Sequence, residues 1–527
     1  MPGFHVENFG CRAARADGEA VGARLRVSGL SERQADEAGV VIVNTCSVTA
    51  EADRAARAYI RRTRRQNPEA RIVVTGCYAQ RAPEELAGLS GVAAVVGNSH
   101  KALVPEIAIR LMHGDHEAAI REGAGFSPHI PEAGNGRALA PEASSSDPQV
   151  DREIASGSES TFVSLHSLLS ASPGRAPIFA DDLFAHSFLE EAQVVPGGQT
   201  RPNLKIQEGC GNRCTFCVIP QTRGGSRSLP ADAILRLVNG FAAAGGNELV
   251  FSGINLGRWG RDLARHCAGQ RPSLAELVRT IFRETELPRL RLSSIEPMDW
   301  DDEMIALMAE FGGTRLCRHA HLPLQSGSDT VLRRMHRRYR PWHYAEKVAA
   351  LVRAAGPELT LGADVMVGFP GETDREFEET LELVRALPFG YLHLFPFSPR
   401  PGTRGWALHA EAAIPAAQVA ERMAALRSLS AEKTRAHREQ FIGRTLDAIT
   451  LQTPADLESS GRTQALTENF LPVEIGGRLP ANRLARIQVT AIEPDATLEA
   501  ITDRTVQAGD GSPRVPIESS CAAVAEA

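Results

Sequence analysis

Hydrophobic residues in the first hundred positions form short apolar runs separated by longer helical stretches. The runs cover residues 40–44, 71–75 and 92–96 and are rich in valine, as strands buried on both faces are. The segments between them are rich in alanine and arginine and have helical character. Strands that alternate with helices predict a doubly wound parallel sheet over residues 1–112.

The alternation stops and then resumes further along the chain. Residues 113–200 are rich in Ser, Gly, Pro and acidic residues, and we interpret them as an acidic low-complexity insertion or linker. Residues 201–435 then contain six candidate strands separated by helical stretches. These strands are predicted at 204–209, 248–255, 290–296, 319–327, 359–369 and 391–398. Six strand–helix units predict an incomplete TIM-type barrel, (βα)6.

The last part of the chain has a third pattern. Residues 440–504 contain short apolar strands punctuated by glycine, which predicts a small β-barrel. The tail, residues 505–527, is expected to be frayed. The predicted fold class is therefore α/β, with a sheet domain, a partial barrel and a small C-terminal β-barrel.

The composition narrows the functional classes. The 527 residues are 43% hydrophobic and 23% charged, so wholesale disorder is excluded. No apolar run approaches the ~20 residues that span a bilayer, and the N-terminus has no apolar segment behind a basic start. We therefore expect a cytoplasmic protein with no membrane contact. In that reducing compartment, nine cysteines indicate metal ligands or reactive thiols rather than disulfides.

Three of the cysteines lie close together in the run EGCGNRCTFCVIP. Cys210, Cys214 and Cys217 have the spacing C-x3-C-x2-C, and three thiolates on one loop can hold three irons of a [4Fe–4S] cluster. The fourth iron is then open to another ligand, as in catalytic metal sites. The loop follows the first barrel strand, at the end where barrel active sites lie. The alternative is a structural zinc site, which normally needs a fourth ligand that this run lacks.

A second set of cysteines is dispersed along the N-terminal domain. Cys11, Cys46 and Cys77 each follow a candidate strand, and the carboxyl ends of parallel strands meet at one edge of a sheet. The three thiols are therefore predicted to converge and to hold a second iron–sulfur cluster. The alternative is that they are buried structural cysteines. The remaining cysteines share no spacing with either set, and we expect structural roles for Cys267, Cys317 and Cys521.

Positive charge is concentrated locally, although the net charge is −6. Residues 115–200 carry a net charge of −9, which leaves +3 for the rest of the chain. One group of arginines shares a face of a helical stretch, and a second group lies beside Tyr339 and Trp342. The two groups are Arg54, Arg57, Arg61, Arg64 and Arg65, and Arg333, Arg334, Arg337 and Arg338. Both are candidate RNA contacts; the alternative is a solvated helix face.

These motifs resemble a known family. The spacing C-x3-C-x2-C with Phe216 before the third cysteine resembles the radical S-adenosylmethionine enzymes. Three further cysteines in an N-terminal α/β domain, followed by a barrel and a small β-barrel of the TRAM type, resemble the methylthiotransferases. The segments HLPLQSGSDTVLRRMHRRY, ADVMVGFPGETDREFEET and FPFSPRPGTR are similar to that family's motifs. The segments PQTRGGSRS and SGINLGRWGRDL look most like the enzymes that modify N6-threonylcarbamoyladenosine in tRNA.

The resemblance implies specific cofactors and roles. Cys210, Cys214 and Cys217 would bind the [4Fe–4S] cluster that chelates S-adenosylmethionine and generates a 5′-deoxyadenosyl radical. Cys11, Cys46 and Cys77 would hold an auxiliary [4Fe–4S] cluster that supports sulfur insertion. The residues expected near the cofactor are Phe216, Gln325 and Ser326. The alternatives are loop packing for Phe216 and a polar strand-to-helix cap for the other two; we assign no general base.

The implied activity is transfer of a methylthio group to C2 of N6-threonylcarbamoyladenosine at position 37 of tRNA. The implied partners are the tRNA anticodon loop and an electron donor such as a flavodoxin or ferredoxin, while the sulfur donor stays open. The rival substrates are isopentenyladenosine 37 and an aspartate of a ribosomal protein. A different alternative is a non-catalytic electron carrier with two clusters. Such a carrier would need neither an iron with an open coordination site nor a barrel. The TRAM-like stretch from 441 to 504 has a net charge of −3, so we expect it to orient RNA rather than attract it.

Overall fold

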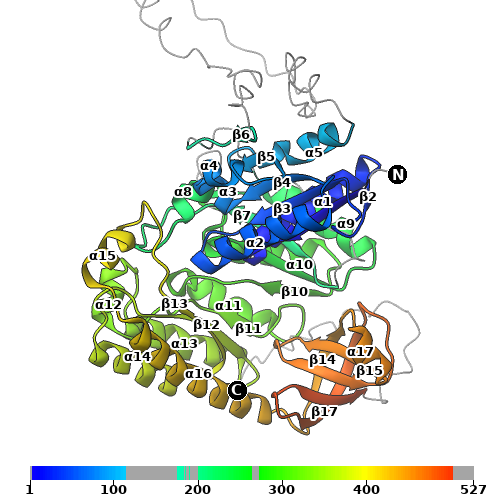
Figure 1. Cartoon of the computed structure of the whole chain (residues 1–527). Helices are drawn as coiled ribbons and strands as arrows, with labels where there is room; N and C mark the ends of the chain where they lie inside the picture. The colour runs from blue at the N-terminus through cyan, green and yellow to red at the C-terminus, as the bar shows by residue number, and fades with distance from the viewer. Residues whose placement is uncertain are drawn as a thin grey trace, which may run out of the picture.

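A computed structural model describes residues 3–113, 175–182, 184, 189, 200–263 and 272–502. Its N-terminal domain is a fully parallel six-stranded sheet (Figure 1). In spatial order the strands are β2 (Ser31–Glu32), β1 (Gly3–Asn8), β3 (Val40–Thr45), β4 (Arg71–Gly76), β5 (Val92–Gly97) and β6 (Ile178–Phe179). The chain goes from β1 outward to β2 and then crosses to β3, so the strand order reverses beside β1. The predicted doubly wound sheet is confirmed.

Helices cover both faces of this sheet because alternate strand residues point to opposite sides. Val40 and Ile42 pack on one side, with the helices α1 (Arg12–Val27) and α5 (Val104–His113). Val41 and Val43 pack on the other side, where the helices are α2 (Ala50–Gln66), α3 (Cys77–Arg81) and α4 (Pro83–Ala87). The edge strand β6 lies inside the stretch that the sequence predicts as an insertion, and its residue Ile178 pairs with Val95.

The central domain is an open arc of six parallel strands, which are divided between two hydrogen-bonded sheets. They are β7 (Asn203–Glu208), β9 (Glu248–Gly253), β10 (Arg289–Leu292), β11 (His319–His321), β12 (Thr360–Val367) and β13 (Phe389–Pro396). A short strand, β8 (Arg227–Ser228), pairs antiparallel with β7. The peptide N–H of Ile295 donates to the His321 carbonyl at 3.0 Å and so joins the β10 end of the arc to β11. The predicted incomplete barrel is confirmed.

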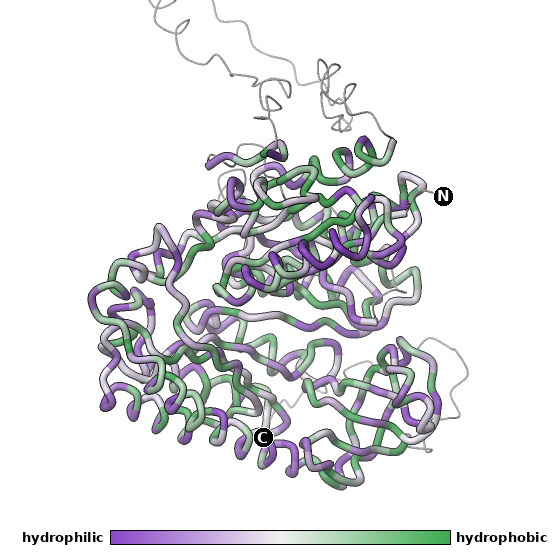
Figure 2. Tube along the Cα trace, viewed as in Figure 1, coloured by the Kyte–Doolittle hydropathy of each residue, from purple (hydrophilic) through white to green (hydrophobic). Residues whose placement is uncertain are grey.

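Most helices of the central domain form its outer layer. They are α9 (Ala231–Ala243), α10 (Leu274–Glu284), α11 (Asp302–Phe311), α12 (Asp329–Arg334), α13 (Pro341–Ala355), α14 (Asp374–Ala386), α15 (Arg404–Ala412) and α16 (Ala416–Glu439). The short helix α8 (Ile219–Arg223) instead lies against the N-terminal domain, where Asn98 Nδ2 donates to the Thr222 carbonyl at 2.8 Å. Figure 2 shows hydrophobic positions along the strands and the inner helix faces, and hydrophilic positions on the outer turns of the helices. No helix within the described ranges is both long enough and apolar enough to cross a bilayer.

The inner face of the arc is polar, which is unusual for a barrel. Leu249, Leu290 and Leu361 point outward into the core beneath the helices, so the residues that alternate with them face inward. A TIM barrel normally fills this space with branched apolar side chains. Here the inward positions include Glu248, Arg289, Arg291, His319, His321, Asp364, Tyr391 and His393. We call the space that they surround the lumen.

The C-terminal domain is a closed five-stranded barrel, as predicted. Its strands run in the order β14 (Thr445–Thr450), β15 (Arg462–Thr467), β16 (Pro472–Gly476), β18 (Leu498–Thr502) and β17 (Leu484–Ile492), with the short helix α17 (Ala455–Ser459). The loop between β15 and β16 reaches the central domain. Phe470 in this loop stacks on His319 with ring centroids 4.3 Å apart. The small barrel therefore contributes a wall to the lumen.

Acid sensitivity is expected at the junction of α16 and β12. Burial lowers the pKa of His437 to about 4, and its Nε2 lies 2.9 Å from the Thr360 hydroxyl. Because the unfolded chain takes up this proton at higher pH than the native chain, native stability is lost as pH falls from about 6.5 to 4. We predict that this one group lowers the free energy of unfolding by about 3 kcal/mol over that interval.

The measurement is urea unfolding at pH 7 and pH 4 for the wild type and for His437→Gln, whose side chain does not titrate. The variant is expected to lose about 3 kcal/mol less than the wild type between the two pH values. An equal loss in both proteins would show that His437 is not the titrating group.

Candidate active site between two cysteine trios

The first trio of cysteines lies on the loop that follows β7. Cys210, Cys214 and Cys217 occupy this loop, and we call them the loop trio. Gly209 begins the loop with a φ of +69°, and a side chain there would overlap the carbonyl oxygen of Gly225. The glycine therefore allows the chain to turn away from the strand and present the thiols at the carboxyl end of the barrel.

Hydrogen-bond donors surround the sulfur atoms of the loop trio. Cys210 Sγ accepts from the peptide N–H of Asn212 at 3.4 Å and from Asn255 Nδ2 at 3.5 Å. Cys214 Sγ accepts from Arg337 Nη1 at 3.3 Å. Such donors stabilise negative charge on sulfur, which is the state that binds metal.

The second trio, Cys11, Cys46 and Cys77, lies at the carboxyl edge of the N-terminal sheet; we call it the sheet trio. Cys11 precedes α1, Cys46 follows β3 and Cys77 begins α3 after β4. These positions flank the point where the strand order reverses, which is where doubly wound sheets bind ligands. Gly10 has a φ of +106°, and a side chain there would overlap that of Cys46. The thiols of Cys11 and Cys77 lie close enough to Cys46 to raise the pKa of its thiol, so the structure brings the three cysteines together.

The sheet trio has its own hydrogen-bond donors, and the thiol pKa of its Cys46 is raised. Cys77 Sγ accepts from Arg223 Nε at 3.2 Å and from Asn98 Nδ2 at 3.4 Å. Burial and the neighbouring thiols Cys77 and Cys11 raise the pKa of Cys46 to about 12. Burial likewise raises the pKa of Cys217 in the loop trio to about 12. Metal binding at either trio must therefore displace thiol protons.

The spacing of the sulfur atoms distinguishes a cluster from a single metal ion. Among the described residues, neither trio has all three sulfur atoms within 4.8 Å of one another. A zinc ion with bonds of about 2.3 Å would hold its sulfur ligands closer together than that. A cluster of several irons spans a larger space, and thiolates with N–H donors are its usual ligands. Both trios therefore fit iron–sulfur clusters better than zinc.

A buried charge network joins the two trios. The network contains two carboxylates, Asp17 on α1 and Glu208 at the end of β7. Both are contacted by Lys101, Lys205 and Arg223. The Nζ of Lys101 lies 2.9 Å from Asp17 and 2.7 Å from Glu208. Burial alone would raise the pKa of Glu208, but the cations hold it well below its usual range. Three cations thus face two carboxylates, and the third cation, Arg223, also donates to Cys77 Sγ.

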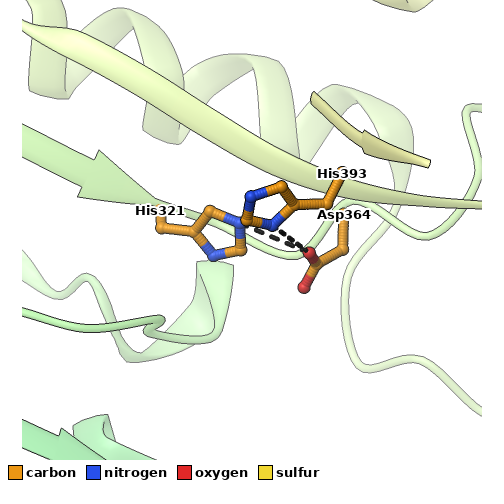
Figure 3. Close-up of side chains that lie close together, drawn as sticks. All are labelled: His321, Asp364 and His393. Atoms are coloured by element: carbon orange, nitrogen blue, oxygen red, sulfur yellow. Dashed lines mark hydrogen bonds and ion pairs between the residues drawn. The ribbon is translucent and has the colours of Figure 1, made fainter. Parts of the chain in front are cut away.

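Inside the lumen, Asp364 lies between two imidazoles (Figure 3). Its Oδ1 is 3.3 Å from His321 Nε2 and 3.2 Å from His393 Nδ1. Burial would raise the pKa of Asp364, but the hydrogen bonds from the two histidines lower it. The three ligand atoms are close enough to hold one metal ion, although the shared carboxylate already accounts for their positions. The His393 side chain is 61% exposed and so remains available to a molecule in the lumen.

Sequence reasoning missed this histidine–aspartate group. The residues lie in the middle of strands, where a pattern search looks for core positions. The available signal was polar residues at alternate positions of β11, β12 and β13, which indicates an inward face that is not packed.

The predicted cofactor residues lie near the barrel ends in different environments. Phe216 is half-buried against the barrel core. Gln325 is buried at a φ of +65°, and its Oε1 has no hydrogen-bond partner among the described residues. Such strain and an unpaired oxygen are typical of ligand-binding positions. The Ser326 hydroxyl instead lies 3.2 Å from that of Thr380, so the polar-cap interpretation describes Ser326.

The arginines of α2 mostly face solvent. Arg54, Arg61 and Arg65 are exposed, whereas Arg57 and Arg64 are half-buried. Arg57 is paired with Glu85 at 2.8 Å. The exposed members remain available for phosphate contacts.

The second arginine group requires a correction. Arg333 and Arg338 are exposed, and Arg334 pairs with Glu376 at 2.9 Å. Arg337 is different, because its side chain is only 4% exposed and is paired with Glu296. The prediction that Arg337 contacts RNA is wrong, since this guanidinium is buried beside Cys214.

Two of the three remaining cysteines, Cys267 and Cys521, lie outside the described residues. Cys317 is buried in the central domain, and burial raises its pKa to about 12. The predicted structural role of Cys317 agrees with this placement.

Two family models match the chain. The model described as the radical SAM superfamily matches residues 204–384, and the one described as uncharacterized protein family UPF0004 matches residues 3–97. The threonylcarbamoyladenosine tRNA methylthiotransferase MtaB of Bacillus subtilis is 31% identical, with 90% of each chain aligned. The protein of the same name from Treponema pallidum is 32% identical over 90% of this chain and 95% of that protein. The tRNA-2-methylthio-N(6)-dimethylallyladenosine synthase of a Parafrankia strain is 29% identical over 95% and 87%.

The two-trio arrangement predicts the iron content of cysteine variants. After anaerobic reconstitution, about eight irons per chain are expected for the wild type and about four for either Cys46→Ala or Cys214→Ala. Cys317→Ala is the matched control and should keep the full iron content. Unchanged iron in Cys46→Ala would contradict a cluster at the sheet trio.

The donor Arg223 is expected to tune the sheet-trio cluster. Arg223→Gln removes a positive charge and an N–H donor near Cys77, so the reduced cluster should be less stable and its reduction potential more negative by roughly tens of millivolts. Redox titration followed by electron paramagnetic resonance measures this. Arg337→Gln is the comparison, because it should shift only the loop-trio cluster. A potential unaffected by Arg223→Gln would show that this contact has no electronic role.

Proposed function

Because this chain belongs to the methylthiotransferase family of radical S-adenosylmethionine enzymes, we propose that it adds a methylthio group to C2 of N6-threonylcarbamoyladenosine at position 37 of tRNA. The observation that carries the proposal is the pair of cysteine trios, one from each domain, which are linked through Arg223 and the buried charge network. A C–H bond on an aromatic ring is inert toward amino-acid bases, so the reaction needs a radical and a sulfur source at one carbon. Two metal centres on the two sides of this domain junction meet that need.

The chain's own residues hold and shield these centres. With clusters bound, the cluster at the loop trio would supply reductive cleavage of S-adenosylmethionine, and the cluster at the sheet trio would support sulfur insertion from a donor that stays open. Asn255, Arg337 and Arg223 donate to the ligating sulfurs and stabilise their charge. The strained Gln325 has a free carboxamide oxygen, and we assign it a contact with the cofactor. Phe216 is a second candidate, because it lies on the loop that carries the loop trio.

The polar lumen supports the choice of substrate. The Parafrankia relative is named for an adenosine with an apolar dimethylallyl group, whereas those from Bacillus subtilis and Treponema pallidum are named for the threonylcarbamoyl form. An apolar group in a lumen lined by His321, Asp364 and His393 would strip water from these side chains without replacing their hydrogen bonds. A threonylcarbamoyl group carries hydroxyl, amide and carboxylate groups that can replace them. The lumen therefore favours the threonylcarbamoyl substrate.

Binding of tRNA is assigned to exposed arginines outside the lumen. Arg54, Arg61 and Arg65 on α2, with Arg333 and Arg338 near α12, are exposed and suit phosphate contacts. The target base must leave its stack, at a cost of a few kcal/mol, and the aromatic rings of Tyr391 and Phe470 offer a surface for it. A small iron–sulfur or flavin protein in the cytoplasm would supply the electrons.

The test is the modified-nucleoside profile of tRNA from a deletion strain. We expect 2-methylthio-N6-threonylcarbamoyladenosine to disappear and the form without the methylthio group to accumulate, because the preceding modification is intact. Wild-type chain should restore the profile, and neither Cys46→Ala nor Cys214→Ala should. In vitro, Cys46→Ala is expected to keep cleavage of S-adenosylmethionine, while Cys214→Ala loses it.

Two outcomes would redirect the assignment. Loss of the methylthio form of isopentenyladenosine alone would identify the other tRNA substrate. An unchanged tRNA profile with an altered ribosomal protein would identify the protein-modifying activity.

A further inference from the structure

Arg12 occupies a special place at the lumen. It is the first residue of α1 and directly follows Cys11 of the sheet trio. Its side chain is exposed, and its guanidinium carbon lies 5.8 Å from the centre of the Phe470 ring. Because Phe470 belongs to the C-terminal barrel and packs on His319 in the lumen, Arg12 faces the lumen rather than the outer surface.

Arg12 has no carboxylate partner among the described residues, since no ion pair within 4.0 Å includes it. The carboxylate Glu248 on the lumen floor is already shared by three other arginines. These are Arg291 at 2.8 Å, Arg201 at 3.5 Å and Arg289 at 3.6 Å. The floor therefore carries an excess of positive charge before Arg12 is added. Such a site is completed by an anion.

The aromatic wall beside Arg12 is held in a fixed position. Phe470 adopts a φ of +70°, a backbone conformation that is strained for a non-glycine residue. The loop is anchored on both sides, because Glu468 pairs with Arg318 at 2.6 Å and Asn469 Nδ2 donates to the Glu358 carbonyl at 3.0 Å. Tyr391 lies on the same wall, with its ring centre 5.4 Å from that of Phe470. A planar group can stack here beside a guanidinium.

We propose that Arg12 binds the carboxylate of the threonylcarbamoyl group and so selects this substrate. The inference rests on the proposed function. In adenine, C2 and C6 flank the same ring nitrogen. A base that turns C2 toward the sheet trio therefore places its N6 substituent beside the residues next to that trio. Arg12, which directly follows Cys11, is one of these residues. A guanidinium matches a carboxylate with two parallel hydrogen bonds.

Arg12 also provides discrimination against other N6 groups. An uncharged substituent such as isopentenyl would cover the guanidinium without pairing with it. Desolvating an unpaired cation is costly, and sites built to pair a polar group reject analogues that lack it strongly. Arg12 is therefore a specificity-determining residue of the proposed reaction, distinct from the residues that hold the clusters.

The experiment compares two anticodon stem-loop RNAs with the reconstituted holoenzyme. One carries N6-threonylcarbamoyladenosine at position 37, and the other carries the same group with its carboxylate converted to a carboxamide. The wild type is expected to favour the acid over the amide by about 10- to 100-fold in kcat/KM. Arg12→Gln should reduce this preference to about threefold or less, and Arg12→Lys should keep part of it.

The matched control is Arg15→Gln. Arg15 lies one turn further along α1, is exposed, and its Nε is 3.7 Å from Glu19. The Arg15→Gln variant should keep the full preference for the acid over the amide. Affinity for both RNAs, measured by fluorescence anisotropy without S-adenosylmethionine, should show the same pattern and does not depend on turnover. The iron content per chain shows whether Arg12→Gln keeps both clusters. If this variant loses a cluster, the inference is decided by the acid-over-amide preference of the wild type and by that of Arg12→Lys.

The outcomes separate this inference from the proposed function. If the wild type modifies and binds the acid and the amide equally well, the role of Arg12 is overturned while the proposed function stands. If the wild type modifies neither RNA but does modify one carrying isopentenyladenosine, the proposed function fails and the inference fails with it. A lost preference in Arg12→Gln together with a full preference in Arg15→Gln supports the inference.

Discussion

The buried network of Asp17, Glu208, Lys101, Lys205 and Arg223 is the interaction on which the site depends. It lies where the N-terminal sheet meets the first strand of the barrel. Removing an ion from water costs several kcal/mol even after relaxation, so each member is stable there only while its partners are in place. A small displacement of one domain would leave a buried charge unpaired. The network therefore fixes the relative position of the two cysteine trios, and Arg223 extends that control to Cys77.

Much of the architecture follows from local patterns. The strands β3, β4 and β5 are continuous apolar runs, and Cys46 and Cys77 come directly after two of them, so their convergence is a consequence of parallel topology. The spacing of the loop trio is equally local. Arg337 and Ser326 could not be assigned in this way, because their surroundings depend on Glu296 and Thr380, which are distant in sequence. Burial of a charged or polar side chain is decided by its partners, and a single sequence does not reveal them.

The polar lumen has a related explanation. Its histidines and arginines occupy strand positions that would be apolar in a filled barrel, and each depends on a residue from another strand, as His321 depends on Asp364. Each of these groups pairs with at least one polar partner, which compensates in part for the absence of apolar packing. Several of their atoms, such as Arg291 Nη1 and Glu248 Oε2, have no hydrogen-bond partner among the described residues.

The contact of Phe470 with His319 also has a consequence for the order of events during synthesis. All six cysteines of the two trios leave the ribosome well before the loop that carries Phe470, and domains fold largely as they emerge. The aromatic wall of the lumen is therefore completed last, when both cysteine trios are already in place. Metal can therefore bind to the trios before the lumen is closed, and the C-terminal barrel supplies the last wall of the lumen to form.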